Sequence, residues 1–336
     1  MHRRARYGAA LLAGSVVLLA AACGSSANKG SGSSGSKIDT TPVKLAFTDT
    51  PDVGDITVLA AMKIMRAQGY NITPEVLNGN TVNATAVASG SAQIGNLSAA
   101  TLFKSINSGQ PFAMLAQTDD NEFAIVAPTS ITRVKQLDGQ VYGLAGPNTS
   151  TAALSDYTEK TNHVSFKVVY VASSSARATA LLSGRITATP LELDDVAKIL
   201  NGSPGKFHVL VDYSKSVPWL LNNVLYTTKS FRAAHKALLQ TLVNDMAKVI
   251  QQAYANPVSF INKYANLLSG YTMDVLVTTM KQSSTSKIWG NNDEITAIAV
   301  SKTLTFDMNG GALTAAQVTE LKSTEKTWFT PIIPSS

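Results

Sequence analysis

The chain has 336 residues, of which 45% are hydrophobic and 15% are charged, a balance that fits a globular protein rather than a disordered one. The formal net charge is +6, but Arg3, Arg4 and Arg6 lie within the first seven residues, so the remainder carries only a mild positive excess. Because no dense run of Lys and Arg is interleaved with aromatic residues, this charge argues against a nucleic-acid partner.

The first 22 residues have the order of an export signal. Residues 1–7 (MHRRARY) are basic, and residues 8–22 (GAALLAGSVVLLAAA) are apolar and uncharged. This apolar run is shorter than the roughly 20 residues that a membrane-spanning helix needs. We therefore predict a cleaved signal peptide over residues 1–22, and an uncleaved membrane anchor is the alternative.

Three alanines at positions 20–22 lead directly into Cys23, the single cysteine of the chain. This segment resembles a bacterial lipobox, although the usual leucine three residues before the cysteine is replaced by alanine and Leu19 stands one place earlier. The resemblance implies a lipid on Cys23 that anchors the protein at the extracytoplasmic face of the bacterial cell membrane. An ordinary secretory signal with a chance cysteine is the alternative. The pair Arg3-Arg4 leaves the general secretory and twin-arginine routes both open.

Residues 23–41 are predicted to form a flexible tether, because the run from 24 to 37 (GSSANKGSGSSGSK) is rich in Gly and Ser and cannot bury a core. A lipid followed by a tether and a globular body describes a protein that is held at a membrane but is free to reach a partner there.

From Val43 onward, short apolar runs alternate with segments of helical period. Val43–Phe47 is a predicted strand, and Ile56–Gln68 is a predicted helix that stops at Gly69. Further strands are expected at 72–77, 92–95, 112–116, 123–127, 141–145, 166–171, 186–189, 207–211 and 223–227, and further helices at 81–89, 99–107, 150–160, 175–183 and 191–200. After Ser230 helices dominate. This alternation predicts an α/β fold with mostly parallel sheets.

One segment occurs twice. Residues 83–90 (NATAVASG) align without gaps on residues 177–184 (RATALLSG), an offset of 94 positions, and each copy follows a strand and precedes another short strand. The repeat predicts two similar lobes, each with its own sheet; coincidence between two Ala-rich helices is the alternative.

Four segments, in this order, carry a family resemblance: VKLAFTDTPDVGDITVLAAMKIMRAQGY, VASGSAQIGNLSAA, AIVAPTSITRVKQLDGQVYGLAGPNTSTAAL and LLSGRITATPLELDD. Over roughly residues 43–260 the chain resembles the type II periplasmic solute-binding proteins of ABC importers, the NMT1/THI5-like group that binds nitrate, sulfonates, taurine and thiamine precursors. One departure is Thr187, where the family commonly has Asp.

The resemblance implies two α/β lobes joined by two crossing strands, with a ligand cleft between them that closes by a hinge motion. Residues 42–127 and 226–336 would form lobe one, and residues 128–225 would form lobe two.

Ligands of open parallel sheets lie beyond the carboxyl ends of the strands, near helix N-termini. The polar loops at these places give the candidate ligand contacts: Asp49, Thr50, Asn78, Asn80, Ser98, Thr118, Asp119, Asn148, Thr149, Ser150, Ser174, Glu192 and Trp219. For each polar residue, an ordinary helix cap or turn is an equal explanation. Trp219, just before the second crossing strand, would stack on a ligand or serve the packing.

Acidic residues gather in two candidate rim loops, at 49–55 and 119–122, and suggest a cationic group on the ligand; a solvated rim is the alternative. Thr149, Ser150 and the serines at 173–175 could instead cradle an oxyanion. A zwitterion such as taurine would suit both sets, as would the aminopyrimidine of a thiamine precursor, and the sequence does not choose between them.

No pattern in the chain points to catalysis. There is no G-x-S-x-G, H-E-x-x-H or Walker sequence, and the four scattered histidines have no metal-ligand spacing, so we expect no catalytic residue, metal or cofactor. The favoured hypothesis is a monomeric solute-binding lipoprotein that delivers its ligand to an importer permease and its ATPase. A lipid-anchored extracytoplasmic enzyme and a sensor subunit that presents ligand are the alternatives.

Overall fold

The computed structural model describes residues 38–147, 149–290 and 295–333. Its strands are β1 (Val43–Phe47), β2 (Ile72–Val76), β3 (Ile94–Ser98), β4 (Phe112–Asp120), β5 (Ala124–Pro128), β6 (Val141–Leu144), β7 (Lys167–Tyr170), β8 (Thr189–Leu191), β9 (Phe207–Asp212) and β10 (Leu221–Thr228). The signal peptide, the lipidated Cys23, the tether up to residue 37 and the candidate contact Asn148 lie outside the described residues.

The helices up to the second crossing are α1 (Ile56–Ala67), α2 (Asn80–Ser89), α3 (Ala99–Asn107), α4 (Ser150–Asn162), α5 (Ser174–Leu182), α6 (Leu193–Gly202) and α7 (Tyr213–Ser216). Those of the C-terminal part are α8 (Lys229–Ala234), α9 (Lys236–Ala255), α10 (Pro257–Tyr264), α11 (Met273–Ser286), α12 (Ala297–Asn309), α13 (Ala315–Ser323) and α14 (Glu325–Trp328). Two short 3-10 turns, η1 (Val134–Leu137) and η2 (Ala265–Leu267), complete the set. Among the described residues, none of the helices joins enough length to enough apolar character to cross a membrane.

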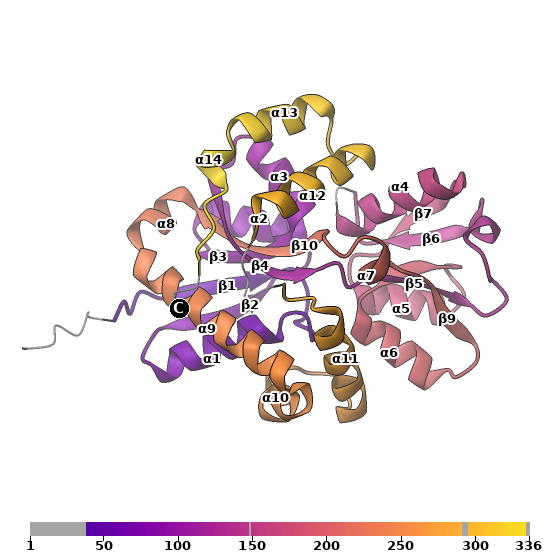
Figure 1. Ribbon diagram of the computed structural model, residues 1–336, viewed down its shortest axis with the longest axis horizontal. Coiled ribbons are helices and arrows are strands. Elements are labelled where there is room, and N and C mark those ends of the chain that lie inside the picture. Colours follow the sequence, from indigo (N-terminus) through magenta and orange to yellow (C-terminus); the bar gives the residue numbers. More distant parts are fainter. Residues whose placement is uncertain (1–37, 148, 291–294, 334–336) are drawn as a thin grey trace, which may run out of the picture. The chain divides into compact units, whose positions relative to one another are not determined.

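The first lobe is built on a five-stranded sheet with the order β2-β1-β3-β10-β4 (Figure 1). Strand β1 pairs in parallel with β2 and β3, whereas β10 runs antiparallel to both of its neighbours. The carboxyl ends of β1 and β3 therefore point to the same edge of the sheet, where the loops that open α1 and α3 begin.

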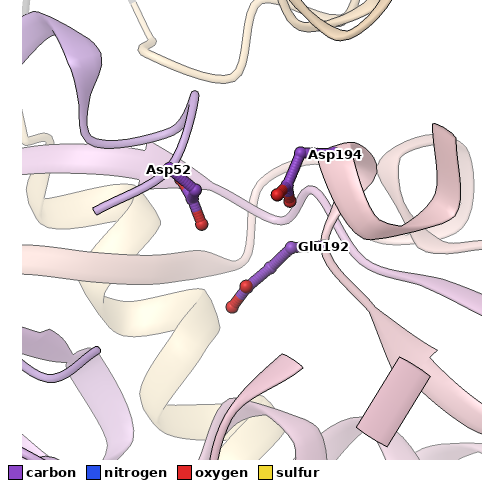
Figure 2. Close-up of side chains that lie close together, drawn as sticks. All are labelled: Asp52, Glu192 and Asp194. Atoms are coloured by element: carbon purple, nitrogen blue, oxygen red, sulfur yellow. The ribbon is translucent and has the colours of Figure 1, made fainter. Parts of the chain in front are cut away.

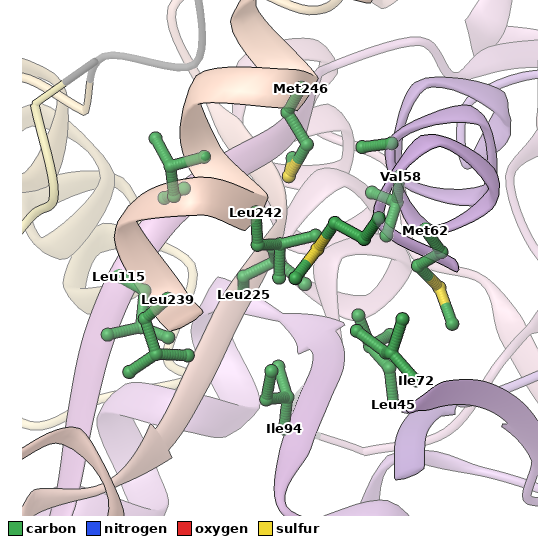
Figure 3. Close-up of a cluster of buried hydrophobic side chains, with 14 of the residues drawn as sticks. Leu45, Val58, Met62, Ile72, Ile94, Leu115, Leu225, Leu239, Leu242 and Met246 are labelled. Atoms are coloured by element: carbon green, nitrogen blue, oxygen red, sulfur yellow. The ribbon is translucent and has the colours of Figure 1, made fainter. Parts of the chain in front are cut away.

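Helices α1 and α9 cover one face of this sheet. Figure 3 shows Val58 and Met62 of α1 and Leu242 of α9 meeting the strand residues Leu45 and Leu225. All five side chains are fully buried, and burial of each such side chain contributes roughly 1.5–3 kcal/mol. The opposite face packs on α2, α3, α12 and α13, with Trp328 buried against Phe103. The sheet is thus fixed from both sides, so the loops at its edge stand on a rigid base.

The second lobe holds the antiparallel strands β8-β5-β9 and the parallel pair β6-β7, joined by a bridge between Tyr142 and Ala188. Helices α5 and α6 contribute to the core on one side, and α4 to the core on the other. The two-lobed α/β fold expected from the sequence is confirmed.

The sheets are more mixed than the mostly parallel sheets that the sequence suggests. The chain leaves the first sheet after Asp120 and joins the second at Ala124, and it returns between Asp212 and Leu221. Strands β5 and β10, which follow these crossings, both pair antiparallel with their neighbours. By strand pairing, residues 124–127 lie in the second lobe and residues 221–225 in the first, so each crossing falls a few residues before the expected boundary.

The repeated segment has the same structure in both lobes. Helix α2 begins at Asn80 and α5 at Ser174, again 94 positions apart. The side-chain oxygen of Asn80 accepts a hydrogen bond from the Ser98 N–H at 2.9 Å, and that of Ser174 accepts one from the Glu192 N–H at 3.2 Å. Since these partners are also 94 positions apart, the repeat reflects one structural unit used twice and not a coincidence.

Candidate functional site

A small cavity of about 70 Å³ lies where loops of both lobes meet. Its lining comes from the ends of β1 and β3, from residues of β10, and from the starts of α2, α4 and α5. The lining residues are Thr48, Asp49, Gly79, Asn80, Ser98, Phe123, Ala145, Thr149, Ser150, Thr151, Ala172, Ser174, Arg177, Glu192, Asn222 and Asn223. The structure therefore brings together Asp49, Asn80, Ser98, Thr149, Ser150, Ser174 and Glu192 of the sequence-predicted residues.

The wall from the first lobe consists of side chains fixed by their own loops. Asp49 accepts a hydrogen bond from the Thr50 N–H at 2.7 Å, and the Ser98 hydroxyl donates to Thr101 at 2.9 Å while it caps α3. Asn80 opens α2 and holds the end of β3 through the Ser98 N–H. Because these side chains are already held in place, little conformational entropy would be lost when they bind a ligand in the cavity.

The wall from the second lobe contains an unpaired hydroxyl. Thr149 caps α4: it donates to the Gly146 carbonyl at 2.8 Å and accepts from the Ala152 N–H. Ser150, the first residue of α4, is 5% exposed and lines the cavity, and its Oγ has no hydrogen-bond partner within the described residues. Burying a hydroxyl without a partner costs free energy, so this group is ready to bond to a molecule in the cavity.

Arg177 supplies a positive charge from beneath the same wall. It is 1% exposed, and its Nε and Nη1 donate to the carbonyls of Pro190, Val171 and Ala172 at 3.1–3.2 Å. These carbonyls end the strands next to α5, so the guanidinium is held in place by backbone groups. Burial lowers the pKa of Arg177, but nearby carboxylates oppose that shift, and the side chain stays a cation.

Two acidic side chains, Asp49 and Glu192, also line the cavity. Burial raises the pKa of Asp49, an effect that the Thr50 N–H and Arg177 oppose. Burial likewise raises the pKa of Glu192 well above its usual range, and Arg177 is the largest opposing influence. The cavity can thus receive an anionic group at the hydroxyls and Arg177 and a cationic group at these carboxylates.

Two predicted contacts lie beneath the cavity instead of on its wall. The Thr118 hydroxyl donates to Asn96 at 2.9 Å, and Asp119 accepts from the backbone and side-chain N–H groups of Asn223 at 3.2 and 3.1 Å. Burial raises the pKa of Asp119 to about 6 against the effect of these bonds. Both residues are fully paired, so they support the crossing strands next to the site.

Three more predicted contacts lie elsewhere. Thr50 is exposed, and Asn78 lines a larger cavity of about 620 Å³ that shares Gly79, Asn80 and Thr149 with the small one. Trp219 lies in a different pocket of about 580 Å³, where its ring packs edge-on against Phe306 with a centroid distance of 5.9 Å. The packing role that the sequence left open for Trp219 therefore accounts for its position.

Sequence reasoning does not identify several of the lining residues. Arg177 stood in the repeated segment at the place of Asn83, and that alignment was the available clue, because both side chains are buried and donate to strand-end carbonyls. Asn222 and Asn223 lie on β10, the strand after the second crossing. A short apolar run does not specify which way the side chains of such a strand point, so the sequence does not place these two residues at the cavity.

A sequence model of the family described as NMT1/THI5 like matches residues 66–259, more than half of the chain. The chain belongs to the NMT1/THI5-like family. No curated protein matches the chain.

Solved structures of low sequence identity share the fold. The ligand-binding component of an ABC-type import system from Staphylococcus aureus, solved with zinc bound, has a TM-score of 0.67 at 15% identity and covers 86% of this chain and 96% of its own. The alkanesulfonate-binding protein from Xanthomonas axonopodis bound to MOPS has a TM-score of 0.65 at 13% identity, covering 82% and 96%. The periplasmic aliphatic sulphonate binding protein from Escherichia coli has a TM-score of 0.62 at 10% identity, covering 88% and 94%. These three relatives are described as binding proteins, and none as an enzyme.

Proposed function

We propose that this chain is the extracytoplasmic solute-binding lipoprotein of an ABC importer and that it delivers a small polar molecule to the permease. The observation that carries the proposal is the unpaired, buried hydroxyl of Ser150, which lines a cavity between two lobes beside the cation of Arg177. No group in this cavity is arranged as a nucleophile with a neighbouring base, so the site is suited to binding and not to catalysis.

The charges favour a zwitterionic solute with an oxyanion and an amine. An oxyanion would accept from Ser150 and from the first N–H groups of α4 and α5, which have no acceptor within their own helices. An ammonium group would face Asp49 and Glu192. The cavity of about 70 Å³ is small, which favours a small aminosulfonate such as taurine over a larger aminopyrimidine.

A thermal-shift screen tests this proposal. Taurine is expected to raise the melting temperature by several degrees at millimolar concentration, since a ligand at 100 times its Kd adds about 2.7 kcal/mol. Ethanesulfonate, which lacks the amine, and ethanolamine, which lacks the sulfonate, are the matched controls and should have smaller effects. Equal shifts with all three compounds would contradict the zwitterion assignment.

Mass spectrometry of the bound solute separates binding from catalysis. After long incubation, the recovered solute should be unchanged. A product in stoichiometric excess over protein would overturn the binding role in favour of an enzyme.

A further inference from the structure

An acidic cluster lies beside the cavity and joins segments far apart in the sequence. It consists of Asp52, in the loop between β1 and α1, Glu192, the residue just before α6, and Asp194, in the first turn of α6. One carboxylate oxygen from each lies within 4.8 Å of the others, and Figure 2 shows the three side chains converging from the two segments. Glu192 also lines the cavity, so the cluster and the cavity share one wall.

A fourth buried carboxylate is directed at the same loop. Glu122, in the crossing between β4 and β5, is 3% exposed, and no ion pair among the described residues includes it. A methyl group added at Gly54 would meet Glu122 Oε1 at 2.6 Å and Asp52 Oδ1 at 3.1 Å, so both oxygens lie against the same glycine. A buried carboxylate that faces other carboxylates without any donor requires a proton or a cation.

The cations nearby offset this charge only in part. Lys198 pairs with Asp194 at 3.2 Å and with Asp195 at 2.9 Å, which leaves it shared between two acids. Arg177 donates to backbone carbonyls. Within the described part of the chain, no ion pair includes Asp52, Glu122 or Glu192.

We propose that this acidic cluster, together with Glu122, binds a hard divalent cation, with Ca²⁺ as the preferred ion. Carboxylate oxygens without nitrogen or sulfur ligands suit Ca²⁺, Mg²⁺ and Mn²⁺ rather than zinc or copper. The ligands come from a loop, a crossing segment and a helix turn, and Ca²⁺ tolerates such irregular geometry, whereas Mg²⁺ demands a near-ideal octahedron.

The ion would tie the two lobes together. Asp52 follows β1 of the first sheet, whereas Glu192 and Asp194 follow β8 of the second. A cation between them bridges the lobes at one end of the cavity and holds Glu192 in place as part of its wall. Glu192 also faces the solute in the proposed function, so Ca²⁺ binding is measured without solute, and its outcome does not depend on which solute occupies the cavity.

Calorimetric titration of Ca²⁺ into the full chain, purified in detergent and stripped with EDTA, tests the proposal. We expect one ion per chain with a Kd of about 0.1–1 mM, in the range of extracellular calcium modules. Tb³⁺ provides a second readout, because Trp289 donates to the Gly54 carbonyl at 2.8 Å and lies close enough to Asp52 to sensitise terbium luminescence, which Ca²⁺ should then quench by competition.

Variants locate the ion. Asp52→Asn and Glu192→Gln should each weaken Ca²⁺ binding at least tenfold, with circular dichroism showing an intact fold. Asp156→Asn, which changes a half-buried acid on α4 outside the cluster, is the matched control and should bind Ca²⁺ normally. If Asp52→Asn fails to fold, Glu192→Gln and the unmodified chain decide the matter. Absence of Ca²⁺ binding by the unmodified chain, or binding that neither cluster variant weakens, overturns the proposal; so does a site that takes ethylammonium but no divalent ion.

Discussion

At the scale of single residues, the hydroxyl of Ser150 allows a test of whether the cavity binds the solute directly. Ser155 provides the comparison, because it lies on the same helix, is 1% exposed, and also has an Oγ without a partner in the described part of the chain, yet it does not line the cavity. The two serines are alike in burial and in lacking a hydrogen-bond partner among the described residues, and they differ in that only Ser150 lines the cavity.

We predict that Ser150→Ala lowers the affinity for the solute about tenfold or more, since loss of one partner from a buried hydrogen bond costs about 1–3 kcal/mol. Ser155→Ala should leave the affinity unchanged. Calorimetric titration with the solute found in the screen measures both. An equal loss in the two variants would mean that α4 was disturbed as a whole and that Ser150 makes no direct contact.

Asp307 of α12 is a buried acid whose Oδ2 has no partner among the described residues, and burial raises its pKa to about 8. The unfolded chain has a pKa near 3.9 at this side chain. Between about pH 4 and pH 8 the folded state therefore holds a proton that the unfolded state has lost. The contribution of Asp307 to stability must then fall as the pH rises, with a slope approaching about 1.4 kcal/mol per pH unit, and level off above about pH 8.

Asp307→Asn, which is neutral and of the same shape, should remove this slope. The variant is expected to match the original protein near pH 4 and to be more stable than it at pH 8. Urea unfolding at several pH values measures the difference. Asp274→Asn, which changes an exposed acid at the start of α11, serves as the control and should leave the pH profile unaltered.

At the scale of elements, the sequence specifies the positions of strands and helices better than the direction in which strands pair. Strand and helix positions follow from period and caps, so β1, α1 and α3 begin where the pattern predicts them. Strand direction does not follow, because a short apolar run such as β5 has the same pattern whether it pairs parallel or antiparallel. The part of the site that consists of loops after strands could be predicted from the sequence. The burial of Arg177 could not, because an arginine on a helix normally indicates an exposed position.

Gly95 of β3 lies in close contact with the buried side chains of Tyr226 and Asn83, and a substitution there tests this packing. A methyl group here would lie 2.3 Å from the ring of Tyr226 and 2.6 Å from the side-chain oxygen of Asn83, and these two side chains are buried and hydrogen-bonded to each other at 2.8 Å. Gly95→Ala should therefore destabilise the fold by about 3 kcal/mol. Gly202→Ala, at the end of α6, meets nothing within 4 Å and should be neutral or slightly stabilising. Urea unfolding of the two variants checks the contrast.

At the scale of the whole molecule, the two lobes meet at more than the cavity. Leu193 of the second lobe packs with Ile56 and Trp289 of the first, and Phe306 of α12 packs into the core around Tyr213. None of these residues lines the cavity, so the lobes are also joined outside it. Any closing motion must keep or exchange them, which favours a small hinge movement over a wide opening.

The proposed lipid on Cys23 would attach the folded part of the protein to the membrane. A lipid contributes about 0.8 kcal/mol for each buried CH₂ group, so a diacylated cysteine holds a protein at the membrane firmly. Cys23→Ala removes the lipid acceptor and should shift the protein from the membrane fraction to the soluble fraction, with solute binding intact. Ser26→Ala, three residues along the predicted tether, is the matched control and should stay with the membrane. Fractionation with immunoblotting measures both variants. Cys23→Ala protein that remains in the membrane fraction would instead show that the apolar run at residues 8–22 is retained as an uncleaved anchor.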